Sequence, residues 1–151
     1  MRVMPIKKAA AVALIYGDMV LLGKRCKEWE GIPVNYGGYW SFFGGSVEEG
    51  EPPALCAARE LLEETEIKVE AHNLKHISSF IEDDLEFIAY SYDVEEAILP
   101  TLNKEHTEYG WFKLNSLRNF IEKIDPKIIE CVELYRRKAD NKEASPSKKT
   151  K

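Results

Sequence analysis

The sequence predicts an α/β sandwich, in which helices pack on the faces of a central sheet. Apolar runs of strand length open the chain, and an acidic segment at about residues 54–65 has an amphipathic helical pattern. Further strand patterns and a helix follow it. Strands in the middle of the chain with two or three helices in mixed order favour a sandwich over a doubly wound parallel sheet.

The chain begins with predicted strands. Residues 9–16 and 19–25 are apolar runs separated by Gly17-Asp18, a strong hairpin signal. Residues 40–43 form a short aromatic segment that predicts another strand. The domain therefore opens with a tight hairpin and a third strand.

A helix is predicted at about residues 54–65. Gly44-Gly45 precedes it, and Pro52-Pro53 lies near its first turn, where proline costs no backbone hydrogen bond. Apolar residues spaced by three and four positions predict its buried face. They are Leu55, Ala58 and Leu62.

The second half of the chain alternates strands and helices. Strands are predicted at residues 76–81, 85–94 and 109–112, and a short helix at residues 116–123. Asp83-Asp84 marks the turn between the first two of these strands. Asp125 and Pro126 supply an N-cap and a first-turn proline for a helix that ends at about residue 137. Its predicted buried residues are Ile128, Val132 and Tyr135.

Length and charge indicate one domain at residues 1–137, followed by a disordered basic tail at residues 138–151. The chain has 151 residues and a formal net charge of −5. The tail carries five lysines and two acidic residues, a charge of +3, so the body carries −8. An acidic body argues against duplex nucleic acid as a partner, because such binding depends on cations that contact phosphates.

The cysteines predict reduced thiols. Cys26, Cys56 and Cys131 are widely spaced and form no CxxC pair, so neither a disulfide framework nor a zinc site is indicated. No signal peptide is recognisable, and no apolar run approaches the roughly 20 residues needed to cross a bilayer. We therefore expect a cytoplasmic protein without membrane contact.

Three glutamates on the predicted helix indicate a site for a divalent cation. Glu60 lies three and four positions before Glu63 and Glu64, so the carboxylates crowd one side of the helix. Magnesium among these oxygens would relieve their repulsion and leave coordination positions for substrate phosphates. The alternative is a solvated acidic face. The preceding loop, the helix start signal and the apolar stripe favour the metal site.

The segment from residue 45 to 67 resembles the Nudix box, a motif of glycine, glutamate and arginine at fixed spacings. The matching residues are Gly45, Glu51, Arg59, Glu60, Leu61, Glu63, Glu64 and Ile67. Similarity extends to residues 21–25, 38–45 and 105–112, and covers roughly residues 8–135. Glu66 departs from the pattern, which has glycine there. We expect either a strained left-handed residue or a changed turn at Glu66.

The resemblance implies a mixed sheet between helices and a magnesium-dependent hydrolase, with Mn²⁺ as an alternative ion. It implies Glu60, Glu63 and Glu64 as metal ligands. The carbonyl of Gly44 is a further candidate ligand, because a glycine pair lets the backbone approach an ion closely. Glu51 and Arg59 are expected to pair with each other and to hold the loop against the helix.

The general base is left open between Glu64 and an acid in the later loop. Glu105 is preferred to Glu108 there, because it lies farther from the strand that holds Trp111. The candidate catalytic residues are therefore Glu63, Glu64 and Glu105. His106 is expected to be an exposed loop residue.

For substrate recognition, the sequence gives candidate residues and leaves their roles open. Arg25 matches a position where relatives place a cation against phosphate, and Tyr39 and Trp40 are candidates for stacking a nucleobase, with a core role as the alternative. The insertion at residues 27–38 is either a substrate lid or a contact in a homodimer.

The expected substrates are small nucleotides: nucleoside triphosphates, ADP-ribose or dinucleoside polyphosphates. Two alternatives are a non-catalytic nucleotide-binding regulator and an enzyme similar to isopentenyl-diphosphate isomerase.

Overall fold

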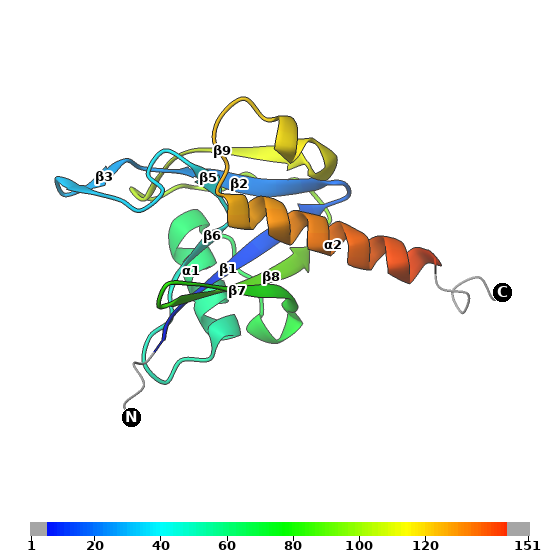
Figure 1. Cartoon of the computed structure of the whole chain (residues 1–151), viewed down its shortest axis with the longest axis horizontal. Helices are drawn as coiled ribbons and strands as arrows, with labels where there is room; N and C mark the ends of the chain where they lie inside the picture. Colours follow the sequence, from blue (N-terminus) through cyan, green and yellow to red (C-terminus); the bar gives the residue numbers. More distant parts are fainter. Residues whose placement is uncertain (1–5, 145–151) are drawn as a thin grey trace.

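The computed structural model describes residues 6–144, which form a mixed sheet with a helix on each face (Figure 1). The strands are β1 (Lys7–Tyr16), β2 (Met19–Arg25), β3 (Glu28–Trp29), β4 (Ile32–Pro33), β5 (Trp40–Ser41), β6 (Phe43–Ser46), β7 (Lys75–Glu82), β8 (Leu85–Asp93) and β9 (His106–Lys113). The helices are α1 (Pro53–Thr65) and α2 (Pro126–Ala144), with short 3₁₀ helices η1 (Ala71–Asn73) and η2 (Leu114–Asn119). The predicted sandwich is confirmed.

The sheet has seven strands, ordered β5-β2-β1-β8-β7, with β6 also paired to β1 and β9 to β2. Strands β1 and β8 are parallel, and the other pairs in this sheet are antiparallel. The predicted hairpins at Gly17-Asp18 and Asp83-Asp84 connect β1 to β2 and β7 to β8. Strands β3 and β4 form a separate hairpin that extends beyond the main sheet (Figure 1).

Strand β1 supplies both halves of the core, because its side chains alternate between the two faces of the sheet. Ala10, Val12 and Leu14 pack on the side of α1. The intervening apolar residues pack on the side of α2 and η2. This arrangement explains why the strand reads as an almost continuous apolar run.

The segment predicted as one strand at residues 40–43 is two strands. Strands β1 and β2 pair only next to their turn, at Ile15↔Val20 and Tyr16↔Met19. Farther along, β5 pairs with β2 and β6 pairs with β1. The chain therefore changes partner at Phe42, which a single aromatic run does not reveal.

The predicted buried face of α1 is wrong. Leu55 and Leu62 are exposed by 50% and 44%. The face against the sheet carries Cys56, Ala57 and Leu61 instead, each at 0% exposure. Helix α1 has apolar residues on two sides, so its periodicity alone could not decide which side the sheet covers.

Glu66 takes the left-handed conformation that a glycine would adopt most easily. Its φ is 64° and its ψ 16°, and its N–H donates to the carbonyl of Leu62 at 2.9 Å. The turn after α1 is therefore kept, at a cost of about 1 kcal/mol or more for a residue with a Cβ.

Helix α2 begins as predicted but ends later. The side chain of Asp125 accepts a hydrogen bond from the N–H of Lys127 at 3.0 Å. Ile128 and Val132 are buried. The helix ends at Ala144 rather than near residue 137, because residues 138–144 include no glycine or proline to stop it. Residues 138–144, predicted as disordered, are therefore helical, and the remaining predicted tail, 145–151, lies outside the described residues.

The short helix predicted at residues 116–123 starts and ends earlier, as the 3₁₀ helix η2, and residues 120–123 are not helical. Within residues 6–144, neither α-helix is long and apolar enough to cross a membrane. Cys26, Cys56 and Cys131 are free and buried.

Candidate active site

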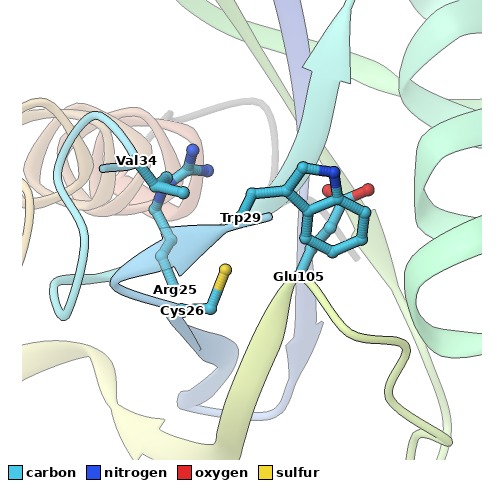
Figure 2. A pocket seen from close by; sticks show the side chains of 5 residues that line it. All are labelled: Arg25, Cys26, Trp29, Val34 and Glu105. Carbon is cyan, nitrogen blue, oxygen red and sulfur yellow. The ribbon is translucent and has the colours of Figure 1, made fainter. Parts of the chain in front are cut away.

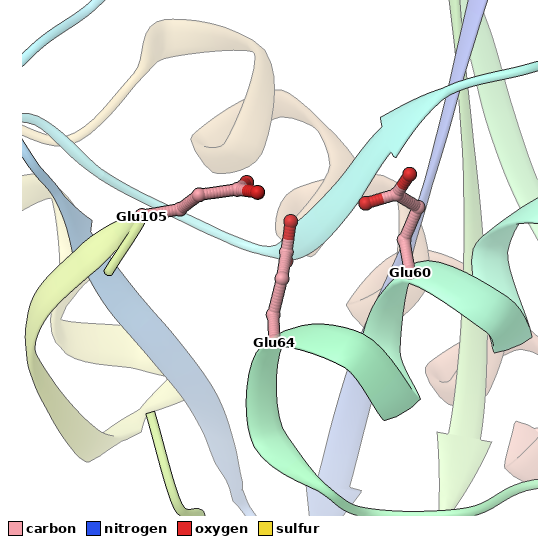
Figure 3. A group of neighbouring side chains, drawn as sticks. All are labelled: Glu60, Glu64 and Glu105. Atoms are coloured by element: carbon pink, nitrogen blue, oxygen red, sulfur yellow. The ribbon is translucent and has the colours of Figure 1, made fainter. Parts of the chain in front are cut away.

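Three carboxylates from two separate segments meet beside the sheet. Glu60 and Glu64 project from α1, and Glu105 projects from the loop before β9; their carboxylates point toward one another (Figure 3). One oxygen of each lies within 4.8 Å of the others. Carboxylate oxygens at this separation are suited to a hard divalent cation.

Glu64 carries the evidence that this group is built to hold a cation. Its side chain is 1% exposed, and one oxygen accepts a hydrogen bond from the N–H of Gly44 at 3.0 Å. The other oxygen is buried with no hydrogen-bond partner. Burial, followed by the nearby Glu105 and Glu60, raises the pKa of Glu64 to about 10. A cation would give this oxygen a partner and favour the charged form.

Gly45 leaves the space that Glu60 occupies. A Cβ at this position would overlap the carboxylate of Glu60, so a residue with a side chain would displace it. Burial, and then the charge of Glu63, raises the pKa of Glu60. The glycine at the start of the motif therefore positions a carboxylate.

Glu63 lies outside the group of three. Its Oε2 atom is 3.2 Å from Nη1 of Arg59, and its side chain is 53% exposed. Its assignment as a metal ligand stays a prediction.

The expected pair of Glu51 and Arg59 is present. Nε and Nη2 of Arg59 donate to the two oxygens of Glu51 at 2.8 and 3.0 Å. These bonds, and then the N–H of Glu48, lower the pKa of Glu51 to about 2. Nη1 of Arg59 also lies 3.1 Å from Glu60, so the guanidinium links the loop to the acidic side of α1.

Asn103 holds the loop of Glu105 against α1. Its side-chain oxygen accepts from the N–H of Glu105 at 2.9 Å, and its amide donates to the carbonyl of Glu63 at 3.4 Å. Its own N–H donates to the carbonyl of Glu64 at 3.3 Å. The sequence analysis missed Asn103. An asparagine two residues before an acidic residue is a signal for such a turn.

Glu108 and His106, which follow Glu105 in the chain, lie outside the group of three carboxylates. Glu108 lies 3.6 Å from Lys24, in an ion pair away from the group of three. The expectation that His106 is exposed is wrong. His106 is 5% exposed at the start of β9, and its ring packs on the ring of Phe43. Burial lowers its pKa to about 4. The strand starts at residue 106 rather than 109, which turns this side chain inward.

Of the predicted substrate-binding residues, Trp40 belongs to the core. It is 4% exposed, its indole N–H donates to Glu122 at 2.8 Å, and the rings of Phe112 and Phe120 contact its edges or faces. A nucleobase has no access to it, so the stacking role predicted for Trp40 is wrong. Tyr39 is partly exposed and packs edge-on against Tyr36.

A cavity of about 210 Å³ lies beside Glu105. It is lined by Arg25, Cys26, Trp29, Val34 and Glu105 (Figure 2). Arg25 is thus placed where a ligand could reach it. Trp29, Cys26 and Val34 were not predicted as site residues. A tryptophan within a short insertion rich in turn-forming residues is the signal that could have identified them.

The cavity makes Cys26 the most accessible thiol. It is 9% exposed, whereas Cys56 and Cys131 are at 0%. Burial raises the pKa of Cys56 to about 11 and that of Cys131 to about 12, so few of these thiols are ionised at pH 8. We expect N-ethylmaleimide to modify Cys26 first in the native protein, as measured by mass spectrometry of peptides. Cys26→Ser is the control, and equal modification of Cys56 or Cys131 would contradict this expectation.

Comparisons with known proteins agree with this fold. A family model described as NUDIX domain matches residues 6–134. A MutT protein from Methanosarcina mazei Go1 aligns over 89% of this chain and 96% of its own, with a TM-score of 0.70 and 22% identity. A mutT/nudix family protein from Listeria innocua aligns over 92% and 97%, with a TM-score of 0.70 and 20% identity. An Ap4A hydrolase from C. elegans aligns over 90% and 99%, with a TM-score of 0.65 and 15% identity. At these identities the solved structures show a shared fold.

Proposed function

This chain belongs to the Nudix family, and on that basis we propose that it is a magnesium-dependent pyrophosphohydrolase of a nucleoside diphosphate linked to another group. The chain is a hydrolase that acts on phosphorus-containing acid anhydrides. The observation that carries the proposal is the buried, unpartnered oxygen of Glu64 within the group of Glu60, Glu64 and Glu105.

Glu60 and Glu64 are proposed to hold the cation, and the carbonyl of Gly44 and Glu63 stay predicted further ligands. When bound, a divalent cation would neutralise charge on the diphosphate and lower the pKa of a bound water molecule. The hydrogen bond from Gly44 to Glu64 and the contact of Arg59 with Glu60 support this assignment, because they orient both carboxylates before substrate binds.

Glu105 is proposed as the general base. It is the exposed member of the group, whereas Glu64 is buried and engaged with Gly44. A carboxylate oxygen of Glu105 accepts a proton from water as the water oxygen forms the new bond to phosphorus. The bridging oxygen leaves with the electron pair of the broken phosphorus–oxygen bond. Asn103 supports this role because it fixes the backbone of Glu105.

The substrate class is proposed as small nucleotides, with Arg25 contacting phosphate or the group attached to it. The acidic group counts against a non-catalytic regulator, since such a protein would not need three convergent carboxylates. An isomerase of isopentenyl diphosphate would need a catalytic cysteine; burial raises the pKa of the Cys56 and Cys131 thiols, so Cys26 would have to fill that role. A cytoplasmic location and a homodimer stay predictions.

Purified protein with Mg²⁺ in ¹⁸O-labelled water is expected to cleave at least one of nucleoside triphosphates, ADP-ribose and Ap4A, the last included because of the C. elegans neighbour. Mass spectrometry would locate the label on one phosphate product. Because the carboxylates need a cation, EDTA is expected to abolish cleavage and added Mg²⁺ to restore it. Absence of cleavage across the panel, or cleavage unaffected by EDTA, would refute the proposal.

A further inference from the structure

We propose that the cavity beside Glu105 binds the nucleobase of the substrate, with the indole of Trp29 as its stacking surface. The β3–β4 hairpin then selects nucleotides over phosphoanhydrides that lack a base. This inference rests on the proposed function, because the cavity adjoins the same group of carboxylates.

The cavity has the size and lining of a subsite for one ring system. Its volume of about 210 Å³ is smaller than the roughly 300–1,000 Å³ of sites that enclose a whole drug-sized ligand. Figure 2 shows Arg25 and Val34 on one side, Trp29 and Glu105 on the other, and Cys26 between them. A planar heterocycle can thus lie between a guanidinium and an indole, both of which stack on bases.

Trp29 presents part of its indole to the cavity. It is 41% exposed on a two-residue strand and is one of the five residues that line the cavity. An indole is a large, rigid aromatic surface, so it can stack on a planar ligand. Because every base has a π-face, stacking on an indole accepts different bases. Trp29 therefore accounts for selection of a nucleotide without fixing which nucleotide.

The opposite side of the cavity offers a cation. Nε of Arg25 donates to the carbonyl of Asn35 at 3.0 Å, which fixes the side chain against the insertion. Among residues 6–140, no carboxylate lies within ion-pair distance of Arg25. Its remaining N–H groups and its guanidinium plane can therefore face a ligand.

The backbone of the insertion holds Trp29 in place. Glu30 and Gly31 have φ values of 52° and 83°, as a two-residue hairpin turn requires, and Trp29 pairs with Ile32. The N–H of Val34 donates to Lys27 at 3.0 Å, and that of Gly38 donates to Arg25 at 2.9 Å. The cavity is therefore formed before a ligand binds.

Glu105 connects the cavity to the reaction. It lines the cavity and belongs to the group of three carboxylates. A base in the cavity thus places the phosphates attached to its ribose next to the carboxylates. Inorganic tripolyphosphate has the phosphates but no base, so it can use the carboxylates alone.

Trp29→Ala is expected to raise KM about tenfold for the nucleotide that wild type cleaves best, the effect of losing one base–aromatic stack. The KM for tripolyphosphate and the kcat for the nucleotide are expected to stay within about twofold. Trp29→Phe, which keeps a stacking surface, should restore most of the affinity. Ile32→Ala is the matched control, since Ile32 pairs with Trp29, is 68% exposed and lies outside the cavity lining.

Binding separates this inference from the proposed function. Calorimetry with Mg²⁺ and α,β-methylene nucleoside triphosphates, which resist cleavage between the α and β phosphates, is expected to show the same tenfold loss in Trp29→Ala. The inference is overturned if no such nucleotide binds wild type, if Trp29→Ala binds it equally well, or if Ile32→Ala is impaired as strongly. A wild type that binds these analogues but cleaves no nucleotide refutes the proposed function alone.

Discussion

Glu64→Gln is expected to lower kcat about a thousandfold toward any substrate that wild type cleaves. The amide can still accept the hydrogen bond from Gly44, so the shape of the site is kept, while the side chain can no longer take the negative charge that a bound cation would favour. Stabilisation by a metal ion is worth several kcal/mol in the transition state, and each 1.36 kcal/mol corresponds to a factor of ten in rate. Steady-state kinetics at saturating Mg²⁺ and substrate would measure the loss.

The stability of the same variant separates loss of chemistry from loss of folding. The pKa of Glu64 is raised to about 10 in the folded protein, so the folded state keeps a proton that the unfolded state loses above about pH 4.5. Its contribution therefore destabilises the metal-free protein as pH rises from about 4.5 toward 10. Glu64→Gln is expected to show a smaller decrease in Tm between pH 5 and pH 8 in EDTA than wild type.

Glu66→Gln is the matched control for this prediction. It makes the same change in charge two residues farther along, at an exposed position. We expect Glu66→Gln to keep its activity. Unchanged kcat in Glu64→Gln, or a Tm so low that the variant is unfolded in the assay, would contradict the role assigned to Glu64.

Local patterns predicted the elements of this fold well. Residues 19–25 form β2 with the predicted bounds, because the hairpin signal at Gly17-Asp18 fixes its start. The capping pair Asp125-Pro126 likewise fixes the start of α2. Such signals depend on a few neighbouring residues, so they can be read without tertiary structure.

Choices between two chemically similar faces or residues could not be made from the sequence. Leu62 and Leu61 are equally apolar, yet only Leu61 faces the sheet. Glu63 and Glu64 are adjacent acids, yet only Glu64 meets Glu105, which lies about forty residues farther along the chain. These outcomes depend on how α1 is rotated against β1 and β6, and that rotation follows from packing of the whole core.

The two adjacent glycines of β6, Gly44 and Gly45, contact different parts of the molecule. A Cβ on Gly44 would overlap β1 at Ala10 and Ala11, so Gly44 is needed for the close pairing of β6 with β1. The three atoms nearest to a Cβ on Gly45 all belong to the carboxylate of Glu60. Adjacent glycines thus have separate roles, and substitutions can test them separately.

Gly45→Ala is expected to weaken Mg²⁺ binding and to lower kcat/KM by about 10- to 100-fold, the usual range when a ligand's support is lost. The added methyl group would push the carboxylate of Glu60 away from Glu64, while β6 stays paired with β1, because a flexible side chain can move where a backbone cannot. Calorimetric titration with Mg²⁺ would measure the affinity, and the Tm in EDTA should remain close to that of wild type.

Ser46→Ala is the matched control, since it removes an exposed side chain from the next position of β6 and leaves the backbone carbonyl that Arg59 contacts at 3.3 Å. We expect Ser46→Ala to bind Mg²⁺ normally. Gly44→Ala should instead lower the Tm strongly with or without metal, because the overlap there is with the backbone. If Gly45→Ala binds Mg²⁺ as tightly as wild type, the position of Glu60 is not what holds the cation, and the ligand set must be sought around Glu63 instead.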